Sequence, residues 1–355
     1  MATSAVFPTA PQRVGMYESF YLRAVSPDRP LGAWIRCTVH KPPGRAALGS
    51  VWCTVFDARA ERPFMHKLTS TQLRAPATGW IAIGDADGAS ESGDAGADGG
   101  ADGVAGAGEG EGASLGPGQS HGRCGDARWS LRLRAHEPEL RHLSPAWLYK
   151  APLPRTKLTS PAPAASFDGR LELAGREPIE LREWRGMVGH NWGSEHAERW
   201  IWLHGIDFAG APDAWLDLAL GRVRLAGRTT PWVASGALCI DGARHRLGWL
   251  AAGRPHVAAN EQGAIVRLTG QGNMTVEVSV QVPARSAARW RYADPRGGER
   301  DVVNCSIAAM QMTVQTRAGA PRTLRTAHGG AYELGMRERD HGVPADLRPV
   351  APSAA

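Results

Sequence analysis

Residues 185–207 read RGMVGHNWGSEHAERWIWLHGID, a stretch that gathers three histidines, two glutamates and three tryptophans. Gly189 and Gly193 bracket its first aromatic residues and indicate a bend or a close approach of the backbone. From Glu198 to Ile206 every second residue is Glu, Trp, Trp, His and Ile, whereas the residues between them are mostly aliphatic. This period of two predicts a strand with an aromatic face, which would line a cavity in a β-barrel.

The same short period continues on either side of this stretch. Residues 34–40 and 51–56 alternate in type and are joined through a Pro-Pro-Gly turn, so they predict a β-hairpin. One side of the hairpin is aliphatic with two cysteines, and the other carries Trp34 and Trp52 beside polar groups; we expect the mixed side to face a cavity. No stretch of helical period exceeds about two turns, so the chain is predicted to be all-β, and its many short strands fit a barrel.

Composition bounds the classes of function. The 355 residues suffice for two domains, and the net charge of +6 is scattered with no nucleic-acid motif beside it, so we predict no nucleic-acid partner. The first residues lack the apolar run of a secretory signal, and no stretch approaches the ~20 apolar residues that cross a bilayer. We therefore expect no integral membrane segment, leave peripheral membrane contact open, and predict a cytoplasmic protein. Five cysteines without a CxxC pair fit free thiols in that reducing compartment.

Residues 84–125 are almost wholly Gly, Ala, Asp, Glu and Ser. Such a composition buries too little apolar surface to offset the entropy lost on ordering, so we predict a disordered acidic insertion between two strands. The segment has neither the spacing of an EF-hand nor a nonapeptide repeat, and we expect no metal there.

Four short segments carry a resemblance to a known family: Tyr17-Glu18-Ser19-Phe20-Tyr21, Trp34-Ile35-Arg36, Gly49-Ser50-Val51-Trp52 and the region from Gly189 to His204. Together they resemble the AttH / hydroxyneurosporene synthase (carotenoid 1,2-hydratase, CrtC-like) family. That resemblance implies two lipocalin-like (calycin-type) antiparallel β-barrels packed together, at 14–198 and 199–340, with flexible tails at 1–13 and 341–355. The family's segment usually reads Asp-His-Glu/Gln-Trp, and here Gly189 and Asn191 replace the acid and the Glu or Gln.

The resemblance also implies chemistry on an isoprenoid double bond. Protonating carbon needs a carboxylic acid that burial keeps protonated, and aromatic faces stabilise the carbocation that forms. The candidate catalytic residues are His190, Glu195, His204 and Glu18. The candidate ligand-binding residues are Tyr17, Asn191, Trp192, Trp200, Trp202, Trp34 and Trp52. Because Gly189 replaces the usual Asp, the most obvious proton donor of such a reaction is missing.

Each candidate also has a plainer interpretation, since the tryptophans fit a packed core and the glutamates fit solvated ion pairs with Arg182 or Arg199. The histidines have no zinc spacing, and no nucleotide, phosphate or hydrolase motif is present, so we predict neither metal nor cofactor.

Three hypotheses about function stay open. The one we favour is binding of a hydrophobic small molecule, an isoprenoid (carotenoid-like), an acyl chain or a polyketide, in an aromatic-lined barrel cavity. The others are a cofactor-free hydratase, cyclase or isomerase, and a filled barrel with a scaffold role. A carboxyl group reaching the same cavity as His190 and Trp192 would favour the enzyme, and a cavity lined only by imidazole, amide and indole would favour binding.

Overall fold

The structure is a computed structural model that describes residues 3–11, 13–86, 110–225, 227–248, 253–317 and 319–337. Over these residues the regular structure consists of β-strands and three short 3₁₀-helices, η1 (Phe7–Thr9), η2 (Ala146–Tyr149) and η4 (Gln271–Asn273). The strands form two large antiparallel sheets and one small hairpin.

The first sheet runs from β1 to β12 and curls into a nearly closed barrel, because β4 and β6, which lie near opposite ends of its hydrogen-bonded order, contact each other. Its strands are β1 (Met16–Val25), β2 (Leu31–Lys41), β3 (Leu48–Asp57), β4 (Phe64–Ser70), β5 (Leu73–Arg74), β6 (Ile81–Gly84), β7 (Gly112–Leu115), β8 (Gln119–Cys124), β9 (Ala127–Ala135), β10 (Leu140–Arg141), β11 (Thr156–Leu173) and β12 (Ile179–Gly193).

The second sheet contains β13, β14 and β17 to β24, and an isolated bridge between Leu247 and Gly270 joins β18 to the end of β20. Its strands are β13 (Arg199–Gly205), β14 (Trp215–Arg222), β17 (Val233–Ile240), β18 (Ala243–Gly248), β19 (His256–Asn260), β20 (Gly263–Thr269), β21 (Thr275–Gln281), β22 (Ala288–Ala293), β23 (Glu299–Gln315) and β24 (Arg322–Met336). A hairpin of β15 (Arg224–Leu225) and β16 (Arg228–Thr229) follows β14.

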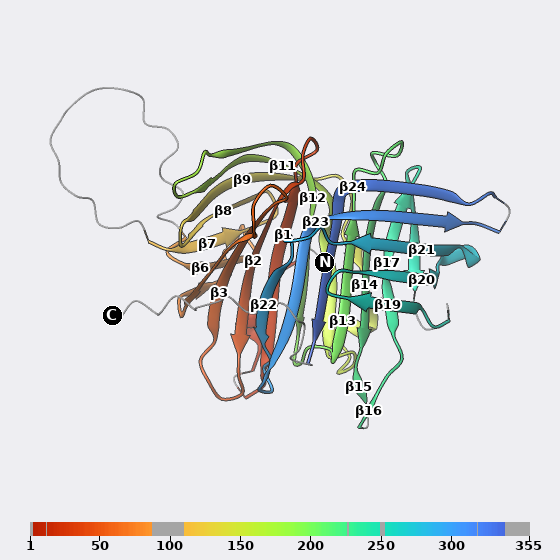
Figure 1. The fold of residues 1–355 in the computed structure, drawn as a ribbon. Helices are drawn as coiled ribbons and strands as arrows, with labels where there is room; N and C mark the ends of the chain where they lie inside the picture. Colours follow the sequence, from red (N-terminus) through yellow and green to blue (C-terminus); the bar gives the residue numbers. More distant parts are fainter. Residues whose placement is uncertain are drawn as a thin grey trace.

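Each sheet brings its first and last strands together. β1 pairs with β12, and β13 pairs with β24, so the chain finishes one curled sheet before it begins the other. Figure 1 shows the two barrels side by side with these four strands toward the middle. The prediction of two packed lipocalin-like barrels is therefore confirmed. That 14–198 and 199–340 behave as independent domains stays a prediction.

The interiors of both barrels are filled by apolar side chains. In the first barrel, alternate residues of the predicted hairpin, Ile35, Cys37 and Val39 with Val51, Cys53 and Val55, point into one core. In the second barrel, Ile201 and Leu203 of β13 enter the other core. This alternation is the period of two that the sequence shows. All five cysteines are buried free thiols, as predicted.

The expectation that the aromatic side of the hairpin faces a barrel cavity is wrong. The aromatic side chains of the hairpin project from the outer face of the first sheet and pack with the core cluster of the second barrel; they are Trp34, Trp52 and Phe56. Trp52 meets Trp290 of β22 edge to face, with ring centroids 4.9 Å apart. The reason is that the outer face of β2 and β3 is covered by β23, so both faces of this hairpin are buried.

Part of the predicted insertion is ordered strand. Residues 110–125 form β7 and β8, because Ala113, Leu115 and Cys124 reach the first core from an otherwise polar sequence. The remainder, 87–109, lies outside the described residues. Because the segment is rich in Gly and Ser, the short alternation of apolar and polar residues in these strands gave no clear strand signal.

The N-terminal tail also differs from expectation over residues 3–11. Ala5 and Phe7 pack against the first core, and the backbone amides of Val6 and Phe7 donate to the Glu18 carboxylate at 2.8 and 2.7 Å. The predicted C-terminal tail, 341–355, lies outside the described residues.

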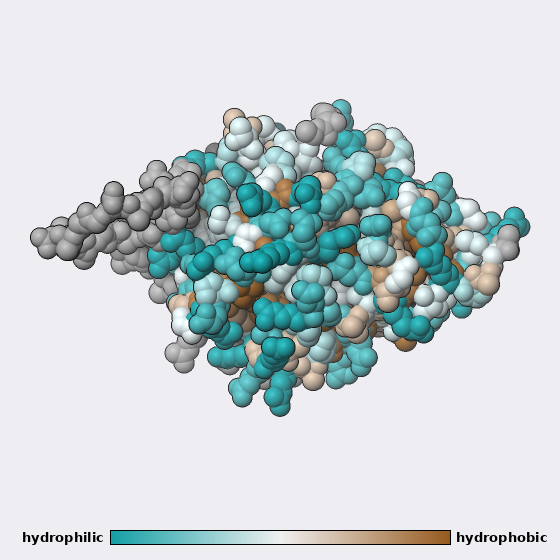
Figure 2. Space-filling model, turned by 90° about the horizontal axis from the view of Figure 1, so that it is seen from above, coloured by the Kyte–Doolittle hydropathy of each residue, from teal (hydrophilic) through white to brown (hydrophobic). Residues whose placement is uncertain are grey.

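The outer surface is mostly hydrophilic on the face that Figure 2 shows, where hydrophobic atoms occur in small separate patches. No helix among the described residues is both long enough and apolar enough to cross a membrane. The apolar residues are thus gathered in the two cores and in the seam between the barrels.

Candidate functional site

A cavity of about 570 Å³ lies between the two barrels, not inside either one. Strands β1, β2, β11 and β12 contribute to one wall, and β13, β14, β17 and β24 to the other. We call this space the inter-barrel cavity. Its aromatic lining includes Tyr17, Tyr21, Trp34, Trp200, Trp202 and Tyr292.

The alternation of β1 and β13 explains why these rings gather in the seam. On β1, Phe20 and Leu22 point into the first core, so Tyr17 and Tyr21 point the other way. On β13 the aliphatic residues enter the second core, so Trp200 and Trp202 project toward the first barrel. The aromatic face predicted for this strand exists, but it lines the space outside its own barrel.

The rings contact one another in pairs. Tyr21 meets Trp202 edge to face at 5.6 Å between centroids, and Trp200 stacks against Tyr292 at 6.2 Å. Burial raises the pKa of both Tyr17 and Tyr21, so these phenols stay protonated and can donate hydrogen bonds.

One carboxylate of the cavity wall is bound by neutral donors. Glu333 of β24 accepts hydrogen bonds from Trp200 Nε1 at 2.8 Å, Tyr292 Oη at 3.2 Å and Asn304 Nδ2 at 3.2 Å. These contacts fix the Trp200 indole ring and the Tyr292 ring in place. A carboxyl group therefore reaches the aromatic cavity, although the sequence did not suggest this one.

The predicted acid Glu195 also lines the cavity, but as an ion-pair partner. Its carboxylate contacts the Arg155 guanidinium, and Arg296 Nη1 lies 3.7 Å away. Beside it, His196 stacks on the Tyr17 ring at 3.8 Å and faces Asp294 at 3.5 Å. Burial lowers the pKa of His196 more than the neighbouring Asp294 raises it.

Two further candidates, Glu18 and His190, meet on the other side of the first sheet. His190 Nε2 lies 2.7 Å from Glu18 Oε1, and both side chains are almost completely buried. The imidazole is stacked between Phe20 and Trp192 at 3.9 and 4.4 Å, and burial lowers its pKa. Because the N-terminal segment covers this pair, the geometry assigns them to packing, and neither residue lines the inter-barrel cavity.

His204, the fourth catalytic candidate, is held in the seam by fixed partners. Arg23 Nη1 donates to His204 Nδ1 at 2.8 Å, and His204 Nε2 donates to the Pro163 carbonyl at 3.0 Å. Burial, with Arg23 as the second cause, lowers the pKa of His204 to about 4. This neutral imidazole does not line the inter-barrel cavity and has no ring nitrogen free for a substrate.

The other ligand-binding candidates divide in the same way. Tyr17, Asn191, Trp200, Trp202 and Trp34 line the inter-barrel cavity. Trp192 instead stacks with His190 and Tyr149, and Trp52 donates its Nε1 to Thr38 Oγ1 at 2.9 Å beside a smaller neighbouring pocket.

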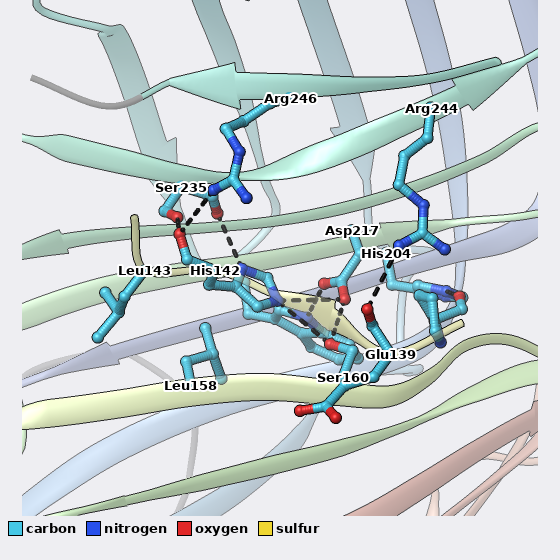
Figure 3. A network of polar contacts seen from close by, with 12 residues as sticks. Glu139, His142, Leu143, Leu158, Ser160, His204, Asp217, Ser235, Arg244 and Arg246 are labelled. Atoms are coloured by element: carbon cyan, nitrogen blue, oxygen red, sulfur yellow. Dashed lines mark hydrogen bonds and ion pairs between the residues drawn. The ribbon is translucent and has the colours of Figure 1, made fainter. Parts of the chain in front are cut away.

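A buried polar network closes one side of the cavity and ties the barrels together (Figure 3). His142 Nε2 lies 3.2 Å from Ser160 Oγ and 3.4 Å from Asp217 Oδ2, and its Nδ1 faces the Ser235 carbonyl at 3.1 Å. Asp217 Oδ1 accepts from Trp202 Nε1 at 3.0 Å. Burial alone would raise the pKa of Asp217, but His142 and its other partners outweigh burial and hold that pKa below its ordinary value.

Residue types alone would suggest a Ser-His-Asp triad here, but the geometry does not. In a triad the carboxylate holds the imidazole nitrogen that faces away from the serine. Here Asp217 lies on the same side as Ser160, which donates to it, and both are almost fully buried. The network therefore anchors Trp202 and joins β11 to β14.

The structure explains the glycine at 189. A Cβ at this position would lie 2.1 Å from Tyr21 Cζ and 2.4 Å from its hydroxyl oxygen. The Tyr21 ring thus occupies the space that a side chain at 189 would need, and no acid fits there.

Sequence reasoning missed several residues of the cavity. Tyr21 and Arg36 had a readable signal, because each lies an even number of residues from a predicted ligand-binding residue on its own strand, Tyr17 and Trp34 respectively. Tyr292 and Glu333 had none, since strand pairing alone brings them there: β24 pairs directly with β13, and β22 pairs with β23, the neighbour of β24.

Among the described residues no group of three or more His, Cys, Asp or Glu side chains is arranged to hold a metal ion. The predicted absence of a metal and a cofactor stays a prediction.

No protein-family model matches the chain, and no curated protein matches it either. Several solved structures share its fold. A Nitrosomonas europaea protein assigned as an AttH is 15% identical, with a TM-score of 0.52, over 95% of this chain and 98% of that chain. A protein named CghA is 11% identical, with a TM-score of 0.56, over 95% of this chain and 94% of that one. At these identities the similarity shows a shared AttH-type, lipocalin-like fold.

Proposed function

We propose that this protein binds a hydrophobic small molecule, an isoprenoid-like or acyl-chain compound, in the inter-barrel cavity. The observation that carries the proposal is a space of about 570 Å³ walled by aromatic rings from both barrels. That volume lies within the range of about 300–1,000 Å³ that is typical of small-molecule sites. Membership in the family that the sequence resembles belongs to the same proposal, and the shared fold supports it.

The rim of the cavity supports an apolar ligand. Trp147, Leu153, Val223 and Leu225 all line the cavity, and all four are exposed, with Trp147 at 64% and Leu225 at 53%. Large apolar side chains in water mark binding surfaces when they cluster. An apolar ligand entering past them would meet apolar side chains first and aromatic rings further in.

A direct test is solvent extraction of the purified protein, followed by mass spectrometry of the extract, together with titration of geranylgeraniol. We expect a bound hydrophobic compound or measurable geranylgeraniol binding. Ala219 lies on β14 opposite Trp202 and lines the cavity, so Ala219→Phe should fill the space and abolish binding. The matched control is Ala258→Phe on exposed β19, which should bind as the parent does. Equal geranylgeraniol binding by the two variants, or no binding by the parent protein, would refute the proposal.

A second candidate function is a cofactor-free hydratase or cyclase. It is favoured by one observation: the Glu333 carboxylate and the Tyr21 phenol share the cavity with Trp200 and Trp202. Protonation of an alkene followed by water attack would add one oxygen to the product. Incubation of geranylgeraniol in heavy-oxygen water would show that label in the product of a hydratase, and no label or rearrangement if the protein only binds.

A further inference from the structure

The inter-barrel cavity contains a buried cation with neutral neighbours. Arg36 of β2 is 5% exposed, and its guanidinium lines the cavity. Its Nε donates to Ser19 Oγ at 2.6 Å, and its guanidinium carbon lies 4.1 Å from the centroid of the Tyr292 ring. Among the described residues no carboxylate lies within 4.0 Å of this guanidinium, which is unusual for so buried an arginine.

Other cations of this seam have carboxylate or carbonyl partners, although the buried Nε of Arg23 has no hydrogen-bond partner. Arg300 pairs with Asp294 at 3.2 Å, Arg155 pairs with Glu195, and Arg337 lies 3.4 Å from Glu198. Arg23 donates to two carbonyls and to His204. Arg36 therefore differs from its neighbours in lacking both a carboxylate and a set of carbonyl acceptors.

Glu333, a carboxylate of the same cavity, does not contact Arg36. Glu333 is separated from it by Tyr292, whose hydroxyl donates to Glu333, and it is already bound by two further donors. Lys67, which lies 3.9 Å from the Trp52 ring, adds a second positive charge beside the smaller pocket that Arg36 also lines. Arg36 thus keeps a guanidinium that no carboxylate contacts, in a cavity that Glu195, Glu198 and Glu333 also line.

Tyr21 is the cross-strand neighbour of Arg36, and both side chains line the cavity, but the Tyr21 ring leans the other way. Its hydroxyl oxygen lies over Gly189 of β12, which pairs with β1 on the side opposite to β2. The Tyr21 hydroxyl is therefore not placed as a second donor beside Arg36, and the donors that an oxygen anion would meet there are those of the guanidinium.

We infer that Arg36 forms an anion subsite in the inter-barrel cavity, so that the ligand is an amphipathic organic acid with an apolar body and a carboxylate or enolate head. This inference rests on the proposed function and specifies the chemical class of the ligand. The apolar body lies along Trp200 and Trp202 toward the exposed rim, and the head group lies at the Arg36 end.

The test compares two probes with the same body and different heads, dodecanoate and dodecanol, titrated into the full chain by calorimetry. We expect dodecanoate to bind at least about tenfold more tightly, since a buried charge-assisted hydrogen bond has an effect of that order. Arg36→Met should reduce the preference to within about twofold.

Two controls keep the outcomes separate. Arg224→Met removes one positive charge from the rim of the same cavity, and it should keep the preference if the effect is local to Arg36. Arg36→Lys keeps a charge and should retain part of the preference if Arg36→Met misfolds.

Equal binding of both probes by the parent protein would overturn the anion subsite and leave the proposed function standing. Failure of both probes to bind would overturn the proposed function itself. A loss of preference in Arg224→Met as large as in Arg36→Met would assign the effect to general charge, not to this subsite.

Discussion

Acid should lower the free energy of unfolding through His204, because the folded structure holds that imidazole neutral. Arg23 donates to its Nδ1, and its Nε2 donates to Pro163, so a proton added at Nδ1 would face a guanidinium in a buried seam. The pKa falls from 6.5 to about 4 on folding. Between these two pKa values the unfolded chain binds a proton at His204 and the folded chain does not. The contribution of His204 to the free energy of unfolding is therefore fully present above pH 6.5 and declines as the pH falls toward 4.

The size of the effect follows from these two values. At about pH 5 the pH is roughly 1.5 units below the pKa of the unfolded imidazole, which is therefore protonated, whereas the folded imidazole is still mostly neutral. Each pH unit of this difference lowers the free energy of unfolding by about 1.36 kcal/mol. The expected loss of unfolding free energy between about pH 7 and pH 5 is about 2 kcal/mol from this residue alone. Burial also lowers the pKa values of His190 and His196, so they act in the same direction.

The contribution of His204 can be isolated by urea unfolding of the parent protein and of His204→Gln at the two pH values. The glutamine cannot titrate, yet its amide can accept from Arg23 and donate toward Pro163. We expect the variant to lose about 2 kcal/mol less than the parent on acidification and to bind dodecanol normally at neutral pH. Identical losses in the two proteins would refute the neutral buried imidazole, and abolished binding at neutral pH would restore a functional role for His204.

Three further predictions concern the same architecture. Gly189→Ala should push the Tyr21 ring into the inter-barrel cavity and weaken dodecanol binding at least tenfold by calorimetry, because its Cβ would lie 2.1 Å from Tyr21 Cζ; Gly118→Ala, with nothing within 4 Å of its Cβ, is the control and should bind normally. Glu18→Gln should loosen the N-terminal segment by about 2 kcal/mol, since the backbone amides of that segment lose a charged acceptor, and aminopeptidase trimming followed by mass spectrometry should be faster than in the parent. Expressed alone, residues 14–198 should aggregate because the outer face of β2 and β3 is exposed, and co-expression with 199–340 should restore a soluble pair by size-exclusion chromatography; a soluble, monomeric fragment would contradict the buried seam.

The class of fold, and the face of its strand on which each residue lies, could be predicted from the sequence alone. A period of two is a local property of the backbone, so the alternation of Ile35, Cys37 and Val39 with Trp34 and Arg36 could be read without knowing any partner strand. The same reasoning placed Trp200 and Trp202 on one face of β13. The free thiols were predicted separately, from five cysteines without a CxxC pair. Periodicity failed at β7 and β8, where few apolar residues signal a strand.

Which face of each sheet lies inside a barrel depends on how the two barrels pack. Periodicity states that two faces differ but not which one is covered by a second barrel, and here the aliphatic faces fill the barrels while the aromatic faces meet between them. This is why Trp200 and Tyr17 line the inter-barrel cavity, whereas His190 and His204 do not. Contacts such as that of Glu333 with Trp200 join residues far apart in the chain, and they exist because β13 pairs with β24.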